Sequence, residues 1–262
     1  VEVLSRVRKS LPARLVLEDA DVRVRARDIR GTQLTLGEMG FDGRVRDGYM
    51  QSSPFFAEIA GTRYEGAVAL DLRDAEPRAQ FWLSAANVNL GRVLRELKLA
   101  ANIEAGVDRF NVYIDSRSSR LASLMANATV AGEIGGGRLA LRDPNMKSQL
   151  QVALARGSLS ARPGERAALQ LSGAIDQTPV EVSLRSATLK ELSDMARRVP
   201  FELIVDAAQT RLQLAGSVDR DISARDVELA LEARGPAFST LDPLAKVSLP
   251  PRGRRSAVGR FR

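Results

Sequence analysis

The feature that most constrains the fold of this chain is a two-residue alternation of apolar and polar side chains. Val22, Val24 and Ala26 are separated by arginines, and the same period recurs over residues 68–72, 79–85, 150–154, 169–171, 180–184 and 227–233. Side chains of a β-strand point to its two faces in turn, so each segment predicts a strand with one apolar and one polar face.

Residues that favour turns interrupt these segments at short intervals. We expect turns at Asp42-Gly43, Asp47-Gly48, Gly61-Thr62, Glu76-Pro77, Gly135-Gly136-Gly137, Asp143-Pro144, Pro163-Gly164 and Gly173. Parallel neighbours need crossovers of a dozen or more residues, so this spacing predicts antiparallel pairing of consecutive strands.

A helical period occurs only in short patches. Asn89 is expected to cap a helix over 90–97, and further patches lie at 121–125, 189–196 and 241–244. Helices of this length cover only the ends or one edge of a long sheet.

The composition removes most catalytic chemistry. The chain has no cysteine and no histidine, which excludes disulfides, Cys/His zinc sites and imidazole bases. The acidic pairs Glu18-Asp19 and Asp219 with Asp221 fall in expected turns, where carboxylates are solvated. We therefore expect no catalytic residue, no metal and no cofactor, and we expect that the chain is not an enzyme.

The net charge of +7 does not predict a nucleic-acid partner, because arginines are spread evenly along the chain. Arg23, Arg25 and Arg27 alternate without aromatic residues between them, which is typical of a solvated strand face. No run of about 20 apolar residues predicts a membrane-spanning helix.

The domain organisation is expected to be one groove built from two sheet segments. We place a first segment at 1–145, with short helical caps, and a second at 146–262 that continues the same groove; one elongated domain is the alternative. The chain starts at Val1 without methionine and ends within an alternating segment, so we expect a fragment of a longer protein.

Three passages of the sequence resemble the AsmA-like family of bacterial envelope proteins. The first runs over 46–50, 54–61, 64–66 and Leu70-Asp71, the second over 77–83, 86–90 and 93–97, and the third over 249–253 with Gly259. The sequence departs from the family pattern at Asn89, where an acidic residue is usual, and at Arg254 and Arg255, where apolar residues are usual. The final strand is therefore expected to be shifted or edge-like.

This resemblance implies a Gram-negative periplasmic protein, anchored to the inner membrane by a segment outside this chain. It implies a role in phospholipid transport and outer-membrane biogenesis, with phospholipid acyl chains, the inner membrane and components of the outer membrane as partners. The family has no catalytic residues to transfer.

The physical consequence of one-sided strands is a sheet that has to shield its apolar face. Each buried leucine contributes roughly 1.5–3 kcal/mol, and the short helices are too few to cover the face. We therefore predict a mainly β fold, a long antiparallel, curved and twisted sheet forming an open groove (half-barrel), although a closed aliphatic core remains the alternative. The candidate lipid-contacting residues are Val68, Leu70, Leu72, Phe81, Leu83, Val152, Leu154, Leu169, Leu171, Val182, Leu184, Leu212, Leu214, Leu229 and Leu231.

Two other functions fit a sheet of this kind. A structural or chaperone-like scaffold for outer-membrane protein assembly would receive client strands at an edge or in the groove. An extracellular β-solenoid adhesin would need a shorter and stricter repeat than this sequence has.

Overall fold

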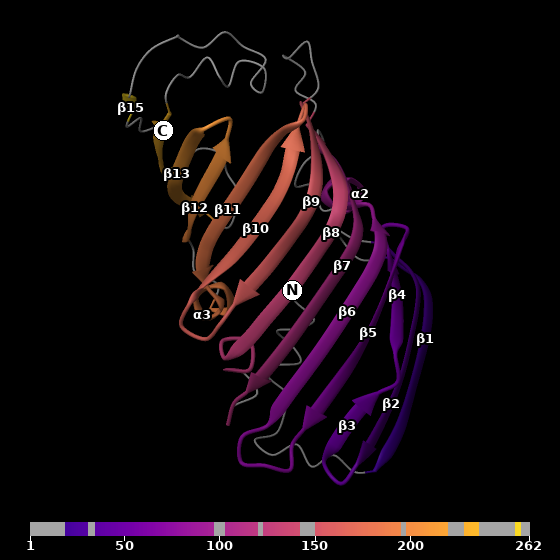
Figure 1. The fold of residues 1–262 in the computed structure, drawn as a ribbon. Helices are drawn as coiled ribbons and strands as arrows, with labels where there is room; N and C mark the ends of the chain where they lie inside the picture. Colours follow the sequence, from indigo (N-terminus) through magenta and orange to yellow (C-terminus); the bar gives the residue numbers. More distant parts are fainter. Residues whose placement is uncertain are drawn as a thin grey trace.

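The structure is a computed structural model of the chain. It describes residues 19–30, 35–96, 103–119, 123–141, 150–194, 198–219, 228–235 and 255–257. Within these ranges one sheet dominates the architecture (Figure 1).

Fifteen strands of the described ranges join in this sheet. They are β1 (Ala20–Arg30), β2 (Thr35–Arg46), β3 (Tyr49–Ser52), β4 (Phe55–Ile59), β5 (Thr62–Asp71), β6 (Arg78–Val88), β7 (Ile103–Arg117), β8 (Ala128–Leu141), β9 (Leu150–Ala161), β10 (Arg166–Ile175), β11 (Thr178–Thr188), β12 (Arg198–Ala207), β13 (Thr210–Asp219), β14 (Glu228–Arg234) and β15 (Arg255–Ala257). Two short helices of the same ranges accompany them, α2 (Leu90–Glu96) and α3 (Leu189–Ser193).

The strand order follows the sequence, and the pairs are antiparallel as predicted. β8 pairs with β9, so the sheet runs without interruption between the segments 1–145 and 146–262. β1 and β15 lie at the two ends of the strand order, and both edges of the sheet turn away from the viewer in Figure 1. The sheet is therefore curved and open, and it does not close into a barrel, in agreement with the predicted half-barrel.

One strand position is divided into two short strands. β3 and β4 both lie between β2 and β5, separated by Ser53 and Pro54. Proline has no N–H to donate to a ladder, which explains the break. The hydroxyl of Ser52 accepts a hydrogen bond from the backbone N–H of Val68 (2.8 Å) and so satisfies a donor at this gap.

A line of extra residues crosses four neighbouring strands. In the pairing of β6 with β7, Ala86 faces Arg109 and the next pair is Val88 with Val107, so one residue on each strand is left without a partner. Each strand therefore carries one residue more than a two-residue period allows. The extra residues are Asn87, Asp108, Gly136 and Ala155. β10 has no extra residue opposite Ala155, and its register with β9 therefore shifts between Ser172 and Gly173. This bulge line returns the following apolar side chains to the face they occupied before it.

The prediction of a turn at the three consecutive glycines was wrong, because they belong to the bulge line. Gly135-Gly136-Gly137 lies inside β8 and not in a hairpin. Gly136 and Gly137 have φ angles of +70° and +145°, which side chains with a Cβ rarely adopt, so the glycines serve the bulge.

Asp42-Gly43 and Gly173 are also strand residues, within β2 and β10, and the prediction of turns there was wrong. A Cβ at Gly43 would lie 2.8 Å from the ring of Phe41, so this glycine makes room for a neighbouring side chain. The turns at Asp47-Gly48 and Gly61 and at Pro163-Gly164 are confirmed, whereas Asp143-Pro144 lies outside the described residues.

The helices are as short as predicted. The side chain of Asn89 accepts a hydrogen bond from the N–H of Arg92 (2.9 Å) and caps α2. Thr188 and Glu191 form a capping box at α3. The patch at 121–125 forms a turn over its described part, and the patch at 241–244 lies outside the described residues.

Buried apolar residues gather at the two ends of the strands. At the α2 end, Tyr64, Val88 and Val107 form a cluster against which Leu90 of α2 packs. Val180 and Ala207 form a second cluster at the same end of later strands. At the α3 end, the buried residues include Val45 and three alanines, Ala128, Ala161 and Ala187. The middle of the sheet contributes far less to the buried core.

Candidate functional site

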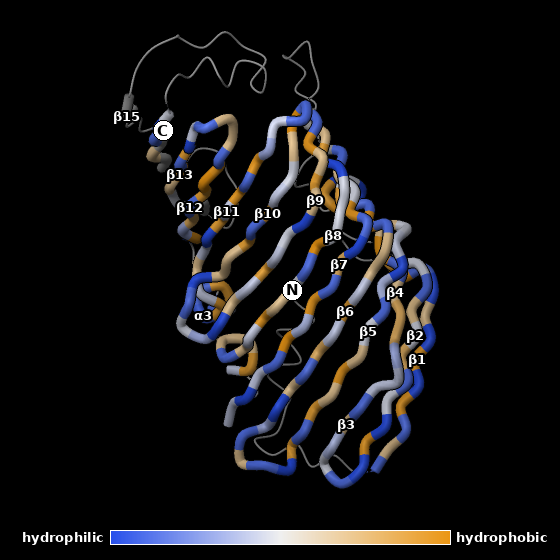
Figure 2. The backbone as a smooth tube through the Cα atoms, viewed as in Figure 1, coloured by the Kyte–Doolittle hydropathy of each residue, from blue (hydrophilic) through white to orange (hydrophobic). Residues whose placement is uncertain are grey.

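The candidate site is the middle of the apolar face. Figure 2 shows hydrophobic and hydrophilic positions alternating along the strands, and the register shows which of them share a face. From β6 to β13, successive partners align in what we call the central row: Leu83, Val112, Gly132, Leu159, Leu169, Leu184, Leu203 and Leu214. At about 4.8 Å between neighbouring strands, this row is about 34 Å long.

Two further rows flank the central row on the same face. Towards α2 lie Ala85, Phe110, Ile134, Gly157, Leu171, Val182, Val205 and Leu212. Towards the α3 end lie Val68, Phe81, Ile114, Val130 and Ala161. The apolar face is thus a band three rows wide, with glycines interspersed.

Nine of the fifteen candidate residues lie in these rows, and three more lie directly beyond them. Leu70 stands one step beyond Val68 on β5, and Leu154 lies beyond the bulge line, packed against the Tyr64 cluster. Leu231 continues the central row in β14, opposite Leu214.

The remaining candidates lie nearer the margins. Leu72 follows the end of β5, where its N–H donates to the carbonyl of Gly48 (2.9 Å). Val152 pairs with Leu139 near the α2 end. Leu229 pairs with Gly216 on β13.

The central row is only half-buried. Every side chain in it from Leu83 to Leu214 is partly exposed, except that Gly132 of β8 is buried. By contrast, Val88 and Val107 at the α2 end are 2% and 5% exposed. Among the described helices α2 covers only that end, and the aliphatic side chains between the two ends stay partly exposed.

Phenylalanine rings show on which side of the curve the apolar face lies. The rings of Phe55 (β4) and Phe81 (β6) stack with centroids 5.9 Å apart although β5 lies between their strands. Gly66 of β5 makes this possible, because a Cβ there would lie 2.7 Å from the Phe55 ring. Side chains on strands that are not neighbours converge on the inside of a curved sheet, so we assign the apolar face to the concave side.

Sequence reasoning missed the apolar residues of three strands. β7, β8 and β12 contribute Val112, Ile114, Val130, Leu203 and Val205 to the rows. In β7 the bulge puts two residues instead of one between Val107 and Phe110, which breaks the two-residue period. The signal in the sequence is a pair of consecutive charged residues, Asp108 and Arg109, between two alternating stretches.

The opposite face of the sheet is polar and carries ion pairs. Arg23 and Arg25 both bind Asp42, at 3.1 and 2.6 Å, and Arg27 binds Glu38 at 3.2 Å. The hydrogen bond from Arg25 lowers the pKa of the Asp42 carboxyl. The prediction of a solvated arginine face on this strand is confirmed, since all three guanidinium side chains are at least half exposed.

The described ranges carry exposed carboxylates at several positions. No cluster of acidic side chains within them could hold a metal ion, and none of their helices is long and apolar enough to cross a membrane. Asp19 accepts a hydrogen bond from the N–H of Asp47 (3.0 Å) in an exposed position, as expected of a turn carboxylate. Glu18 and Asp221 lie outside the described residues.

The arrangement can therefore offer a long, partly exposed aliphatic surface on the concave side and a charged surface on the other. Its chemistry is nonspecific apolar contact along the rows. No protein-family model, curated protein or solved structure matches this chain.

Proposed function

We propose that this chain is the periplasmic part of an inner-membrane-anchored AsmA-like protein that takes part in phospholipid transport and outer-membrane homeostasis. The central row carries the proposal: eight successive strands each contribute an aliphatic side chain or a glycine to one aligned, partly exposed line. The AsmA-like resemblance of the sequence gives that line a biological setting.

The energetics of the rows suit acyl chains. Each methylene that leaves water for an apolar contact gains about 0.8 kcal/mol. The rows present aliphatic carbon at nearly every strand, so an acyl chain keeps a similar contact as it moves from one strand to the next. A surface with uniform affinity lets a lipid move along it without a deep trap.

The dimensions suit acyl chains as well. One leaflet of a bilayer has a hydrocarbon depth of about 15 Å, half of the roughly 30 Å core. The central row is about 34 Å long at the usual strand spacing, so a single acyl chain occupies less than half of it. More than one lipid can therefore lie along the sheet at a time.

A pair of variants on one strand tests the proposal. Leu159 belongs to the central row, whereas its neighbour Ser158 is exposed on the polar face. Leu159→Asp should lower the amount of bound phospholipid about tenfold or more, because an unpaired carboxylate in an apolar contact costs more than about 1.4 kcal/mol. Ser158→Asp adds the same charge to the same strand and should leave the bound lipid unchanged.

The measurement is native mass spectrometry of protein purified from membranes, with binding of a fluorescent phospholipid as a second readout. Circular dichroism shows that both variants keep the sheet. A folded wild-type protein that carries no lipid and binds no fluorescent phospholipid would contradict the proposal. Equal lipid binding by Leu159→Asp and Ser158→Asp would contradict the assignment of the site to this face.

A second candidate function is a scaffold that receives client strands, and one observation favours it. β1 pairs only with β2 within the described ranges, and its residues Val22, Val24 and Ile29 are 42%, 41% and 37% exposed. An edge strand with exposed aliphatic side chains can pair with a strand of another protein. Photocrosslinkers placed at Val24 and at Leu159 separate the two functions: polypeptide adducts at Val24 favour the scaffold, and lipid adducts at Leu159 favour transport.

A further inference from the structure

An aromatic pair lies on the polar face of the sheet, opposite the face that carries the central row. Trp82 of β6 and Tyr113 of β7 are direct partners in the register, and they are 40% and 41% exposed. Their neighbours along this line of the sheet are Ala67 and Ala131, both small. The two rings therefore rise above the small residues beside them on the polar face.

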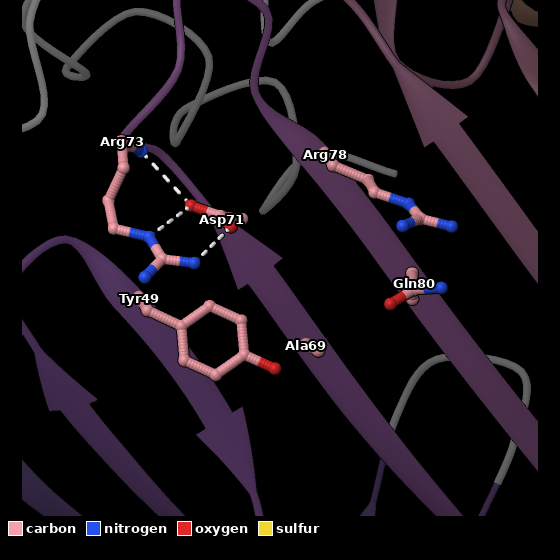
Figure 3. A pocket seen from close by; sticks show the side chains of 6 residues that line it. All are labelled: Tyr49, Ala69, Asp71, Arg73, Arg78 and Gln80. Carbon is pink, nitrogen blue, oxygen red and sulfur yellow. Dashed lines mark hydrogen bonds and ion pairs between the residues drawn. The ribbon is translucent and has the colours of Figure 1, made fainter.

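A pocket adjoins this aromatic pair. It has a volume of about 250 Å³ and is lined by Tyr49, Ala69, Asp71, Arg73, Arg78 and Gln80, as Figure 3 shows. The Gln80 amide donates a hydrogen bond to the hydroxyl of Tyr113 (2.6 Å), so the pocket and the aromatic pair form one continuous surface. Drug-sized ligands occupy roughly 300–1,000 Å³, so this pocket has room for about one sugar-sized ring.

The charges at the pocket are paired with one another. Arg73 binds both carboxylate oxygens of Asp71, at 2.8 and 2.6 Å, and its guanidinium packs 5.1 Å from the centroid of the Tyr49 ring. Arg78 binds both carboxylate oxygens of Asp115, at 2.9 and 2.8 Å.

These ion pairs hold the carboxyl groups in the charged form. The Arg73 guanidinium lowers the pKa of Asp71 to about 2, and Arg78 lowers the pKa of Asp115. The two pairs together carry no net charge, yet they fix several donors and acceptors in place.

We propose that Trp82, Tyr113 and this pocket form a binding site for a saccharide. A pyranose ring has an apolar C–H face that stacks on an exposed aromatic ring, and it has hydroxyl groups that both donate and accept hydrogen bonds. Paired carboxylates and guanidiniums beside an amide offer both functions in fixed positions. A phosphate-rich ligand such as single-stranded nucleic acid fits less well, because it requires uncompensated positive charge.

This inference is independent of the lipid function, since the site lies on the other face of the sheet. The experiment can exploit the composition of the chain, because Trp82 is its one tryptophan. Intrinsic tryptophan fluorescence therefore reports on the proposed site alone. The probes are chitohexaose, maltohexaose and cellohexaose, each titrated into the full chain.

The expected result is a saturable blue shift of the tryptophan emission with at least one of the three sugars. Tyr113→Ala should weaken that binding about tenfold, since it removes one stacking ring. Gln80→Ala should also weaken it, whereas Tyr113→Phe keeps the ring and should have the smaller effect. Arg185→Ala changes an exposed polar-face residue on β11 and should have no effect.

Three outcomes would overturn the inference. The first is no change in emission and no heat of binding with any of the three sugars at millimolar concentration. The second is equal affinity of Tyr113→Ala and the wild type, with both shown to be folded by circular dichroism. The third is a shift caused by a thymidine oligonucleotide and by none of the sugars.

Discussion

Val107 and Val112 lie on the same strand and the same face, yet their surroundings differ. Val107 is 5% exposed within the cluster at the α2 end, and Val112 is partly exposed in the central row. The first position lies in a buried cluster against which Leu90 of α2 packs, and the second has no described helix over it and keeps part of its surface exposed. The comparison indicates that this apolar face has two uses: its α2 end holds the sheet together, and its middle is available to a ligand.

The largest expected effect comes from placing a charge at these two positions. Val107→Asp should lower the free energy of unfolding by about 3–5 kcal/mol, because a carboxylate is buried without a partner and a packed side chain is lost. Val112→Asp should lower it by about 1 kcal/mol, since its carboxylate can reach water. Urea unfolding followed by circular dichroism measures both, and equal losses would break the comparison.

The next effect concerns the bulge line that brings Val107 onto the apolar face. Gly137 has a φ angle of +145°, and a Cβ there would clash with the carbonyl oxygen of Gly106. Gly137→Ala should cost about 2–3 kcal/mol in unfolding free energy, because a side chain strains this backbone. Gly132→Ala is the matched control in the middle of the same strand, with its nearest Cβ contact at 3.2 Å, and should cost no more than about 1 kcal/mol.

A smaller effect is expected from the cap of α2, the helix that covers this end. Asn89→Ala removes the acceptor for the N–H of Arg92 and should lower the unfolding free energy by about 1 kcal/mol. Asn89→Asp keeps a capping oxygen and should retain the wild-type value. Thermal unfolding followed by circular dichroism distinguishes them, and a loss of stability in Asn89→Asp would exclude capping as the role of this residue.

The smallest effect is expected on the polar face. The pKa of Asp71 is lowered from 3.8 to about 2 by Arg73, so the charged pair contributes fully above pH 3.8 and is lost as the pH falls through about 2. Arg73→Ala should return this pKa towards 3.8. Carboxyl NMR titration measures the shift, and stability at neutral pH should change little because the pair is solvated.

The sequence predicted the type of fold because the two-residue period is visible wherever a strand is regular. β5, β6, β10 and β11 were found in this way, and their short connections predicted antiparallel pairing. β7 and β8 were less visible, because the bulge at Asp108 and Gly136 breaks the period.

Glycines caused the remaining errors. Gly43 and Gly173 look like turn residues in the sequence, but they lie within strands where a neighbouring side chain or backbone needs the space. The size of a neighbour on the next strand depends on register, and register becomes visible only when the strands are paired.

The candidate lipid residues were found strand by strand, but their alignment could not be predicted. Leu83 and Leu214 lie more than a hundred residues apart in the sequence, and they share one line only because every intervening strand keeps its register. The aromatic pair was equally hidden, since Trp82 and Tyr113 are joined by the pairing of β6 with β7.

The plain order of the strands gives this architecture an unusual way to change in evolution. Duplicating or deleting one hairpin would lengthen or shorten the concave surface by about 10 Å, two strand spacings, and leave its width unchanged. Reach and cross-section are thus independent quantities here. A gene could adjust the distance that the protein covers without redesigning any contact within it.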